Sequence, residues 1–100
     1  MRIVNPGMDI RLWLVYMEDG QVVSGLDHLK VKVDGDDSSS LLSETTLTEE
    51  GSTGFYYYDW TTSSAFLGKE AIALFTRSGE ILCSEGYYFD IIEDMDGIAT

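Results

Sequence analysis

The sequence predicts an all-β fold, a single antiparallel β-sandwich of about seven to eight strands. Short runs rich in β-branched and aromatic residues recur between Ile10 and Ile92. Turn sequences separate these runs, at Asp19-Gly20, Asp34-Gly35-Asp36, residues 50–54, Ser78-Gly79 and Glu85-Gly86. This alternation of short strands and turns is typical of antiparallel sandwiches. Residues 63–69 are long enough for one helical turn at most.

The first half of the chain contains the clearest strand, over residues 10–17. It is apolar on both faces apart from Arg11, which suits a central strand with Leu12 and Leu14 inward and Trp13 and Val15 on the other face. A hairpin turn at residues 18–21 leads to a short returning strand. Residues 29–33 alternate strictly, which places three apolar residues inward and two lysines outward, a pattern of sheet-edge protection.

The second half begins with a loop at residues 34–40 and a weaker strand near residues 42–48. An aromatic strand follows at residues 54–60, then a hairpin joining residues 71–76 to residues 80–83, and a closing strand at residues 87–92. Alternation along these strands predicts the hydrophobic core. Its expected members are Ile10, Leu12, Leu14, Val31, Val33, Phe55, Tyr57, Ile72, Leu74 and Phe89.

One hundred residues predict one domain spanning residues 1–100, with its core region at residues 9–92. A chain of this length buries roughly two-thirds of its unfolded surface, which is enough to form a stable core without disulfide bonds. Cys83 is the single cysteine, and we expect it to be a small buried residue. The first residues do not read as a signal peptide, and no apolar run approaches the ~20 residues that span a bilayer. We therefore expect a product released into a cytoplasm.

Charge is the second strong constraint on function. Eighteen acids against six bases give a net charge of −12, dispersed along the chain. Such a field repels phosphate backbones and anionic lipid surfaces, which argues against nucleic-acid and membrane partners. Three explanations stay open: solubility, a basic partner surface, or adaptation to high salt, which would screen the repulsion.

The residues that catalysis requires are sparse. His28 is the only histidine, at a turn where we expect surface placement, and one histidine with one cysteine does not make a zinc site. The glycines at positions 51 and 54 precede a strand rather than a helix, so they do not form a phosphate-binding loop. We expect no enzyme activity and no cofactor.

Acidic clusters are weak candidates for calcium. Asp34, Asp36 and Asp37 share one loop, and calcium prefers several oxygens from such loops. The alternative is a solvated acidic loop. Further acids crowd residues 90–96, and Asp94-Met95-Asp96-Gly97 begins like a calcium loop, but the chain ends at Thr100 before a closing glutamate. We expect no metal there.

The aromatic strand is the best binding candidate in the sequence. Tyr56, Tyr58 and Trp60 lie on one face of it, where they would form a stacking stripe for sugars or a contact patch for a protein partner. The alternative is a central strand with both aromatic faces covered.

As a whole, residues 9–92 resemble the immunoglobulin-like modules of virion proteins from tailed phages and related archaeal viruses. The resemblance rests on residues 10–15, 19–26, 29–33, 54–59 and 86–89. Similar patterns occur in bacterial surface and macroglobulin-like sandwiches, and the cysteine pair of antibody domains is absent.

The resemblance implies an immunoglobulin-like sandwich and a virion accessory role, as a capsid decoration, neck or tail component. Such a subunit is made in the host cytoplasm and docks on other virion proteins in many symmetric copies, with an acidic surface that directs it to a basic patch. The alternative is a carbohydrate-binding or adhesion module that keeps its aromatic stripe exposed.

Overall fold

The computed structural model describes residues 1–90, and this part of the chain is all-β, as predicted. A 3₁₀ turn at Ser64–Phe66 lies within residues 63–69, where the sequence allows one helical turn at most. The closing strand was expected to reach Ile92, which is outside the described residues. The strands are β1 (Arg2–Val4), β2 (Asp9–Val15), β3 (Met17–Glu18), β4 (Gln21–Val22), β5 (Leu29–Gly35), β6 (Ser40–Thr46), β7 (Thr48–Glu49), β8 (Phe55–Thr61), β9 (Glu70–Arg77) and β10 (Glu80–Phe89).

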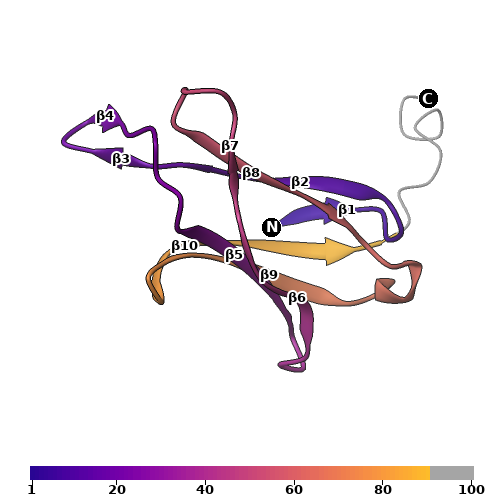
Figure 1. Ribbon diagram of the computed structural model, residues 1–100. Coiled ribbons are helices and arrows are strands. Elements are labelled where there is room, and N and C mark those ends of the chain that lie inside the picture. Colours follow the sequence, from indigo (N-terminus) through magenta and orange to yellow (C-terminus); the bar gives the residue numbers. More distant parts are fainter. Residues whose placement is uncertain (91–100) are drawn as a thin grey trace.

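The strands form two facing layers and a small hairpin (Figure 1). One layer is a five-stranded sheet of order β1-β10-β9-β5-β6, and the other is a three-stranded sheet of order β2-β8-β7. The β3–β4 hairpin extends from one end. β1 pairs with β10 in parallel, so the larger sheet is mixed rather than wholly antiparallel. The strand count exceeds the expected seven to eight because four strands have only two or three residues. The turn expected at Glu85-Gly86 is wrong, because β10 runs through both residues and joins the two strands expected at residues 80–83 and 87–92.

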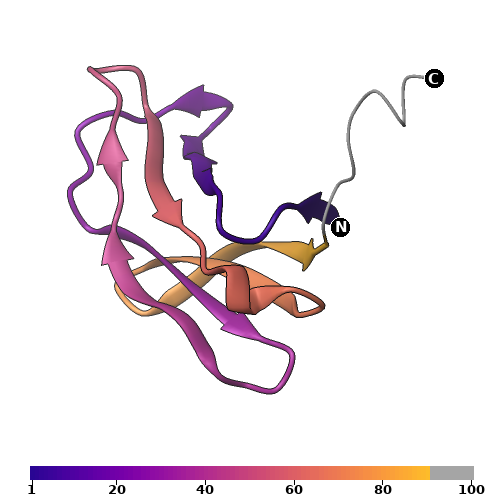
Figure 2. The ribbon, with the colours of Figure 1, turned by 90° about the vertical axis from the view of Figure 1, so that its right-hand side faces the viewer.

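The chain changes layers at Leu47, between β6 and β7. Figure 2 shows β6 continuing into β7 as the chain leaves one sheet for the other. Leu47 is buried, and its N–H donates to the carbonyl of Leu29 at 2.8 Å. The single strand expected near residues 42–48 is therefore two strands in different sheets.

Two strands occupy positions that differ from the prediction. β2 lies at the edge of the three-stranded sheet instead of its centre, and β5 lies between β9 and β6 instead of at an edge. The side chains of Lys30 and Lys32 therefore lie on the outer face of the five-stranded sheet and do not protect an edge. The predicted orientation of side chains is right in β2, with Leu12 and Leu14 buried and Trp13 and Val15 outward.

The core between the layers contains six of the predicted residues, Ile10, Leu12, Leu14, Val31, Val33 and Phe89. Aromatic rings fill much of the remaining volume. The ring of Trp60 lies 5.8 Å from Phe89 and 5.9 Å from Phe66, measured between centroids, and the last two rings are 5.3 Å apart. Such tilted and edge-on arrangements stabilise aromatic clusters beyond simple area burial.

The predicted core residues of β8 and β9 are wrong. Phe55 is 42% exposed and Ile72 is 41% exposed, while Tyr57 and Leu74 are only half-buried. The inward residues are their sequence neighbours, Tyr56 and Trp60 in β8 and Ala71, Ala73 and Phe75 in β9. Both strands are apolar on both faces, so a one-residue error in phase exchanges the two faces completely.

Asp59 explains the orientation of β8. It shares a face with Phe55 and Tyr57, and a carboxylate without a partner is too costly to bury in an apolar core. That face must therefore point outward. In β9 the inward positions hold two alanines because the large rings of the other strands already occupy the interior at close packing.

The buried side chain of Tyr56 in β8 makes hydrogen bonds to the backbone of another segment. This side chain is fully buried, and its hydroxyl donates to the carbonyl of Val23 at 2.7 Å and accepts from the N–H of Leu26 at 3.3 Å. These bonds hold the segment between β4 and β5 against the core.

We expect Tyr56→Phe to lower the free energy of unfolding by about 1–3 kcal/mol, because it leaves two backbone groups without a partner. Chemical denaturation measures this change. Tyr57→Phe is the matched control, since the Tyr57 hydroxyl makes no hydrogen bond to another residue within 1–90, and it should change stability little. Equal effects of the two variants would contradict the assignment.

Candidate functional site

The outer surface of the three-stranded sheet presents paired side chains from two strands. We call it the outer β2–β8 face. Register pairs place Val15 opposite Phe55, Trp13 opposite Tyr57, and Arg11 opposite Asp59. Cross-strand neighbours of this kind interact directly, so the six side chains form one continuous ladder.

Arg11 organises this ladder. Its Nε and Nη2 donate to the two carboxylate oxygens of Asp59 at 2.6 and 2.9 Å. The guanidinium carbon also lies 4.0 Å from the ring centroid of Tyr57 and 5.3 Å from that of Trp13. The hydrogen bond from Arg11 lowers the pKa of Asp59. The pair therefore stays ionised as the pH falls, until the depressed pKa of Asp59 is reached.

Apolar side chains extend the face toward the β3–β4 hairpin. Trp13 and Phe55 are each 42% exposed and Val15 is 45% exposed. Val22 and Met17 of the hairpin are exposed as well, and Val22 approaches the backbone at Gly54, next to Phe55. Large apolar groups gathered on a folded domain typically mark an interaction surface.

The aromatic stripe predicted from the sequence is not on this face. Tyr56 is fully buried, Trp60 is 3% exposed, and Tyr58 packs half-buried against the core. The prediction that these three residues form an exposed contact surface is wrong, because they share the inward side of β8. The exposed ring of β8 is instead Tyr57, beside Trp13 of β2 at 5.6 Å between centroids.

The sequence contained a signal for the correct face. Arg11 alternates in phase with Trp13, and Asp59 alternates in phase with Tyr57. Charged residues mark the solvent side of a strand, so both strands point these aromatics outward.

The three weak calcium candidates do not converge on one point. The Asp37 carboxylate accepts hydrogen bonds from the N–H and hydroxyl of Ser39 and lies 3.7 Å from the Nζ of Lys69. These bonds, led by that from the Ser39 hydroxyl, lower the pKa of Asp37. No group of three acidic, histidine or cysteine side chains within residues 1–90 is arranged to hold a metal ion. The acids at positions 93, 94 and 96 lie outside the described residues.

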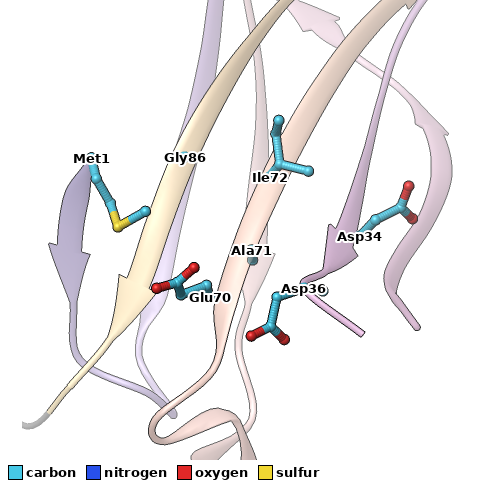
Figure 3. A pocket seen from close by; sticks show the side chains of 8 residues that line it. Met1, Asp34, Asp36, Glu70, Ala71, Ile72 and Gly86 are labelled. Carbon is cyan, nitrogen blue, oxygen red and sulfur yellow. The ribbon is translucent and has the colours of Figure 1, made fainter. Parts of the chain in front are cut away.

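Asp34 and Asp36 border a hollow on the outer surface of the five-stranded sheet instead (Figure 3). This hollow has a volume of about 210 Å³ and is open to solvent. Residues of β5, β9 and β10 and the start of the chain surround it. Its lining residues are Met1, Asp34, Gly35, Asp36, Glu70, Ala71, Ile72 and Gly86.

Cys83 is exposed, so the prediction of a buried cysteine is wrong. It lies on β10, close to a register shift between Ile81 and Cys83, where strict alternation with β9 is interrupted. Partial desolvation, together with the nearby Glu85 carboxylate, raises the pKa of the Cys83 thiol. A raised pKa leaves little thiolate at neutral pH, and the thiolate is the reactive form.

His28 is only partly exposed, because the side chain of Arg77 hydrogen-bonds to it. The Nε–H of Arg77 donates to Nε2 of His28 at 2.8 Å, which requires that nitrogen to be unprotonated. Arg77 also contacts the hydroxyl of Tyr16 and lies 3.4 Å from a carboxylate oxygen of Glu18. These contacts join the ends of three chain segments, which is a structural role.

Comparison of the chain with protein-family models, with curated proteins and with solved structures found no match. Within residues 1–90 no helix has the length and apolar character needed to cross a membrane.

Salt should stabilise the free domain. Even full pairing of the six bases would leave twelve acids unmatched, and their repulsion is stronger in the compact state than in the expanded chain. We expect the thermal midpoint to rise with NaCl and equally with KCl, because screening is not ion-specific. A flat or falling midpoint would contradict this expectation. A sharp response to micromolar CaCl₂ would instead indicate a calcium site.

Proposed function

We propose that this chain is a non-catalytic protein-binding domain that docks through its outer β2–β8 face. The observation that carries the proposal is the cluster in which Arg11 lies against Trp13 and Tyr57 while paired with Asp59. Tryptophan, tyrosine and arginine are the residue types that dominate the energy of protein interfaces. Pairing with Asp59 holds Arg11 in place before binding, which reduces the entropy lost on docking.

The same geometry favours a protein partner over a sugar. A sugar ring stacks on a flat, open aromatic surface, but the Arg11 guanidinium already occupies one side of the Tyr57 ring. The planes of Trp13 and Tyr57 are also inclined by 52°, so the two rings do not form one platform. The carbohydrate-binding alternative therefore has less support.

The strand order supports an immunoglobulin-like fold as part of this proposal. β2, β8 and β7 follow the order of strands B, E and D of that fold, while β10, β9, β5 and β6 follow the order G, F, C and C′. The connections agree as well, with hairpins between β7 and β8 and between β9 and β10.

In its specific form, the proposal is a virion accessory subunit, as a capsid decoration, neck or tail component. The resemblance of residues 9–92 to virion modules supports this role. The net charge of −12 supports a basic protein partner and disfavours nucleic acid and anionic membranes. We propose that copies made in the host cytoplasm dock on virion proteins in symmetric array, without a cofactor.

Particle incorporation tests this function. Trp13→Ala should reduce incorporation into particles by tenfold or more, because a truncated anchor typically costs about 2 kcal/mol or more of binding energy. Ile81→Ala is the matched control, since Ile81 is 57% exposed on the other sheet. It should be incorporated normally. Circular dichroism and thermal unfolding establish that both variants fold.

Two results would contradict the proposed function. One is normal incorporation of the Trp13→Ala variant. The other is binding of the wild-type domain to a glycan array without binding to any virion protein, which would favour the adhesion alternative.

A further inference from the structure

The hollow on the five-stranded sheet exists because a glycine occupies the middle of a strand. Gly86 lies on the outer side of β10, directly opposite Ile72 of β9. A Cβ at Gly86 would have its nearest contacts at 3.8 and 4.0 Å, so neither packing nor backbone conformation requires glycine. Glycine inside a strand weakens the sheet and often marks a place where another molecule approaches closely.

The chemistry of the hollow combines an apolar floor with an acidic rim. The side chains of Ile72 and Met1 supply the apolar surface, and Figure 3 shows Glu70 and Asp36 near one another at one end. Asp34 lies on the same outer face of β5, paired with Ile72 in register. Among the residues that the structure describes, none makes an ion pair or a side-chain hydrogen bond with Asp34, Asp36 or Glu70.

Neither of the two nearby lysines makes an ion pair with this rim. Lys69 precedes Glu70, but its Nζ lies 3.7 Å from Asp37. Lys32 is on the outer face of β5, two residues before Asp34. It pairs in register with Leu74 rather than with Ile72. Three carboxylates therefore face solvent around an apolar surface that they do not cover.

We propose that this hollow receives a lysine side chain from a partner protein. The four-carbon stem of lysine would lie on Ile72 and in the space left by Gly86, while its ammonium group would meet the carboxylates at the rim. The hollow and the outer β2–β8 face lie on different sheets. This proposal therefore stands or fails independently of the proposed function, and variants at one surface leave the other intact.

The test is a titration of ¹⁵N-labelled domain with the peptide tetralysine, followed by amide chemical shifts. The matched probe is the same peptide with every side chain acetylated, which keeps the stem and removes the charge. We expect tetralysine to shift the amides of Glu70, Ile72 and Gly86 in a saturable manner. The acetylated peptide should leave them unchanged.

Variants separate this site from general attraction to an acidic surface. Gly86→Val fills the hollow without changing charge, and its Cβ has room, so the variant should fold and lose these shifts. Glu70→Gln should weaken binding by about threefold, the effect of one exposed ion pair. Glu80→Gln, which removes a charge at the far end of β10, should have no effect at these amides.

Three results would overturn the proposal: shifts spread evenly over all acidic segments, undiminished binding by the Gly86→Val variant, or equal shifts with the acetylated peptide. A fall in the thermal midpoint of Gly86→Val would be checked with Gly86→Ala, which adds one methyl group at ordinary contact distance and should weaken binding partially.

Discussion

Replacing Trp60 with alanine is expected to lower the free energy of unfolding by about 3–5 kcal/mol, as for other large aromatics removed from a core. A typical domain has about 5–15 kcal/mol in total, so much of the stability would be lost. For a chain of this length the thermal midpoint should fall by at least about 12 °C. Thermal and chemical unfolding measure both quantities.

The reason lies in the position of the indole. Trp60 is 3% exposed and contacts the rings of Phe66 and Phe89, which connect the 3₁₀ turn and β10 to the three-stranded sheet. Its loss would leave a cavity that the surrounding strands cannot close.

Trp13→Ala is the control for this prediction. It removes the same side chain from the other face of the same sheet, where Trp13 is 42% exposed. We expect it to cost about 1 kcal/mol, the scale of an exposed cation–π contact and a tilted ring pair. If the Trp60 variant were as stable as the Trp13 variant, the orientation of β8 would be wrong.

The second large effect is expected at Gly54, the residue before β8. Its φ is +78°, and an added Cβ would lie 2.0 Å from a methyl carbon of Val22 and 3.1 Å from the carbonyl oxygen of Val23. Gly54→Ala therefore combines backbone strain with a steric clash. Each contributes about 1–3 kcal/mol, so we expect a loss of about 3 kcal/mol or more.

Gly51→Ala isolates the backbone contribution. Gly51 lies in the same turn with a φ of +61°, and nothing is within 4 Å of its added Cβ. We expect a loss of about 1–2 kcal/mol, from the left-handed conformation alone. Chemical denaturation of both variants gives the comparison. Equal losses would show that the β4 segment does not pack on Gly54.

Local sequence predicted the hairpin turns at residues 19–20 and 78–79 because their chemistry is self-contained, but the turn expected at Glu85-Gly86 is wrong, since both residues lie inside β10. The Asp19-Gly20 and Ser78-Gly79 pairs both adopt positive φ at both residues, as a two-residue hairpin between twisted strands requires. The orientation of β2 and β5 was also predictable, since each carries charged residues on only one side.

The orientation of β8 and β9 could not be read from apolar alternation, because both faces of these strands are apolar. The one signal in β8 is the charge of Asp59, which marks the outer side and pairs with Arg11, 48 positions away. Sheet positions are likewise long-range. The chain changes sheets at Leu47, where the N–H donates to the carbonyl of Leu29. These two residues are far apart in sequence, so the residues around Leu47 do not indicate the change.

The candidate site was missed for the same reason. Trp13 and Tyr57 were each visible as aromatic strand residues, but their common face arises from the register of β2 and β8. The hollow depends on still more distant contacts, since Met1, β5, β9 and β10 all contribute to it. Alternation within one strand contains no information about such contacts.

Site-specific photo-crosslinking is the most direct test of docking through the outer β2–β8 face. Benzoylphenylalanine would replace Phe55 in one sample and Ile81 in another, and assembled particles would be irradiated and their crosslinks identified by mass spectrometry. We expect position 55 to crosslink to a virion structural protein and position 81 to give at most a trace of that product. Absence of a protein crosslink at position 55, or equal yields at both positions, would contradict docking through this face.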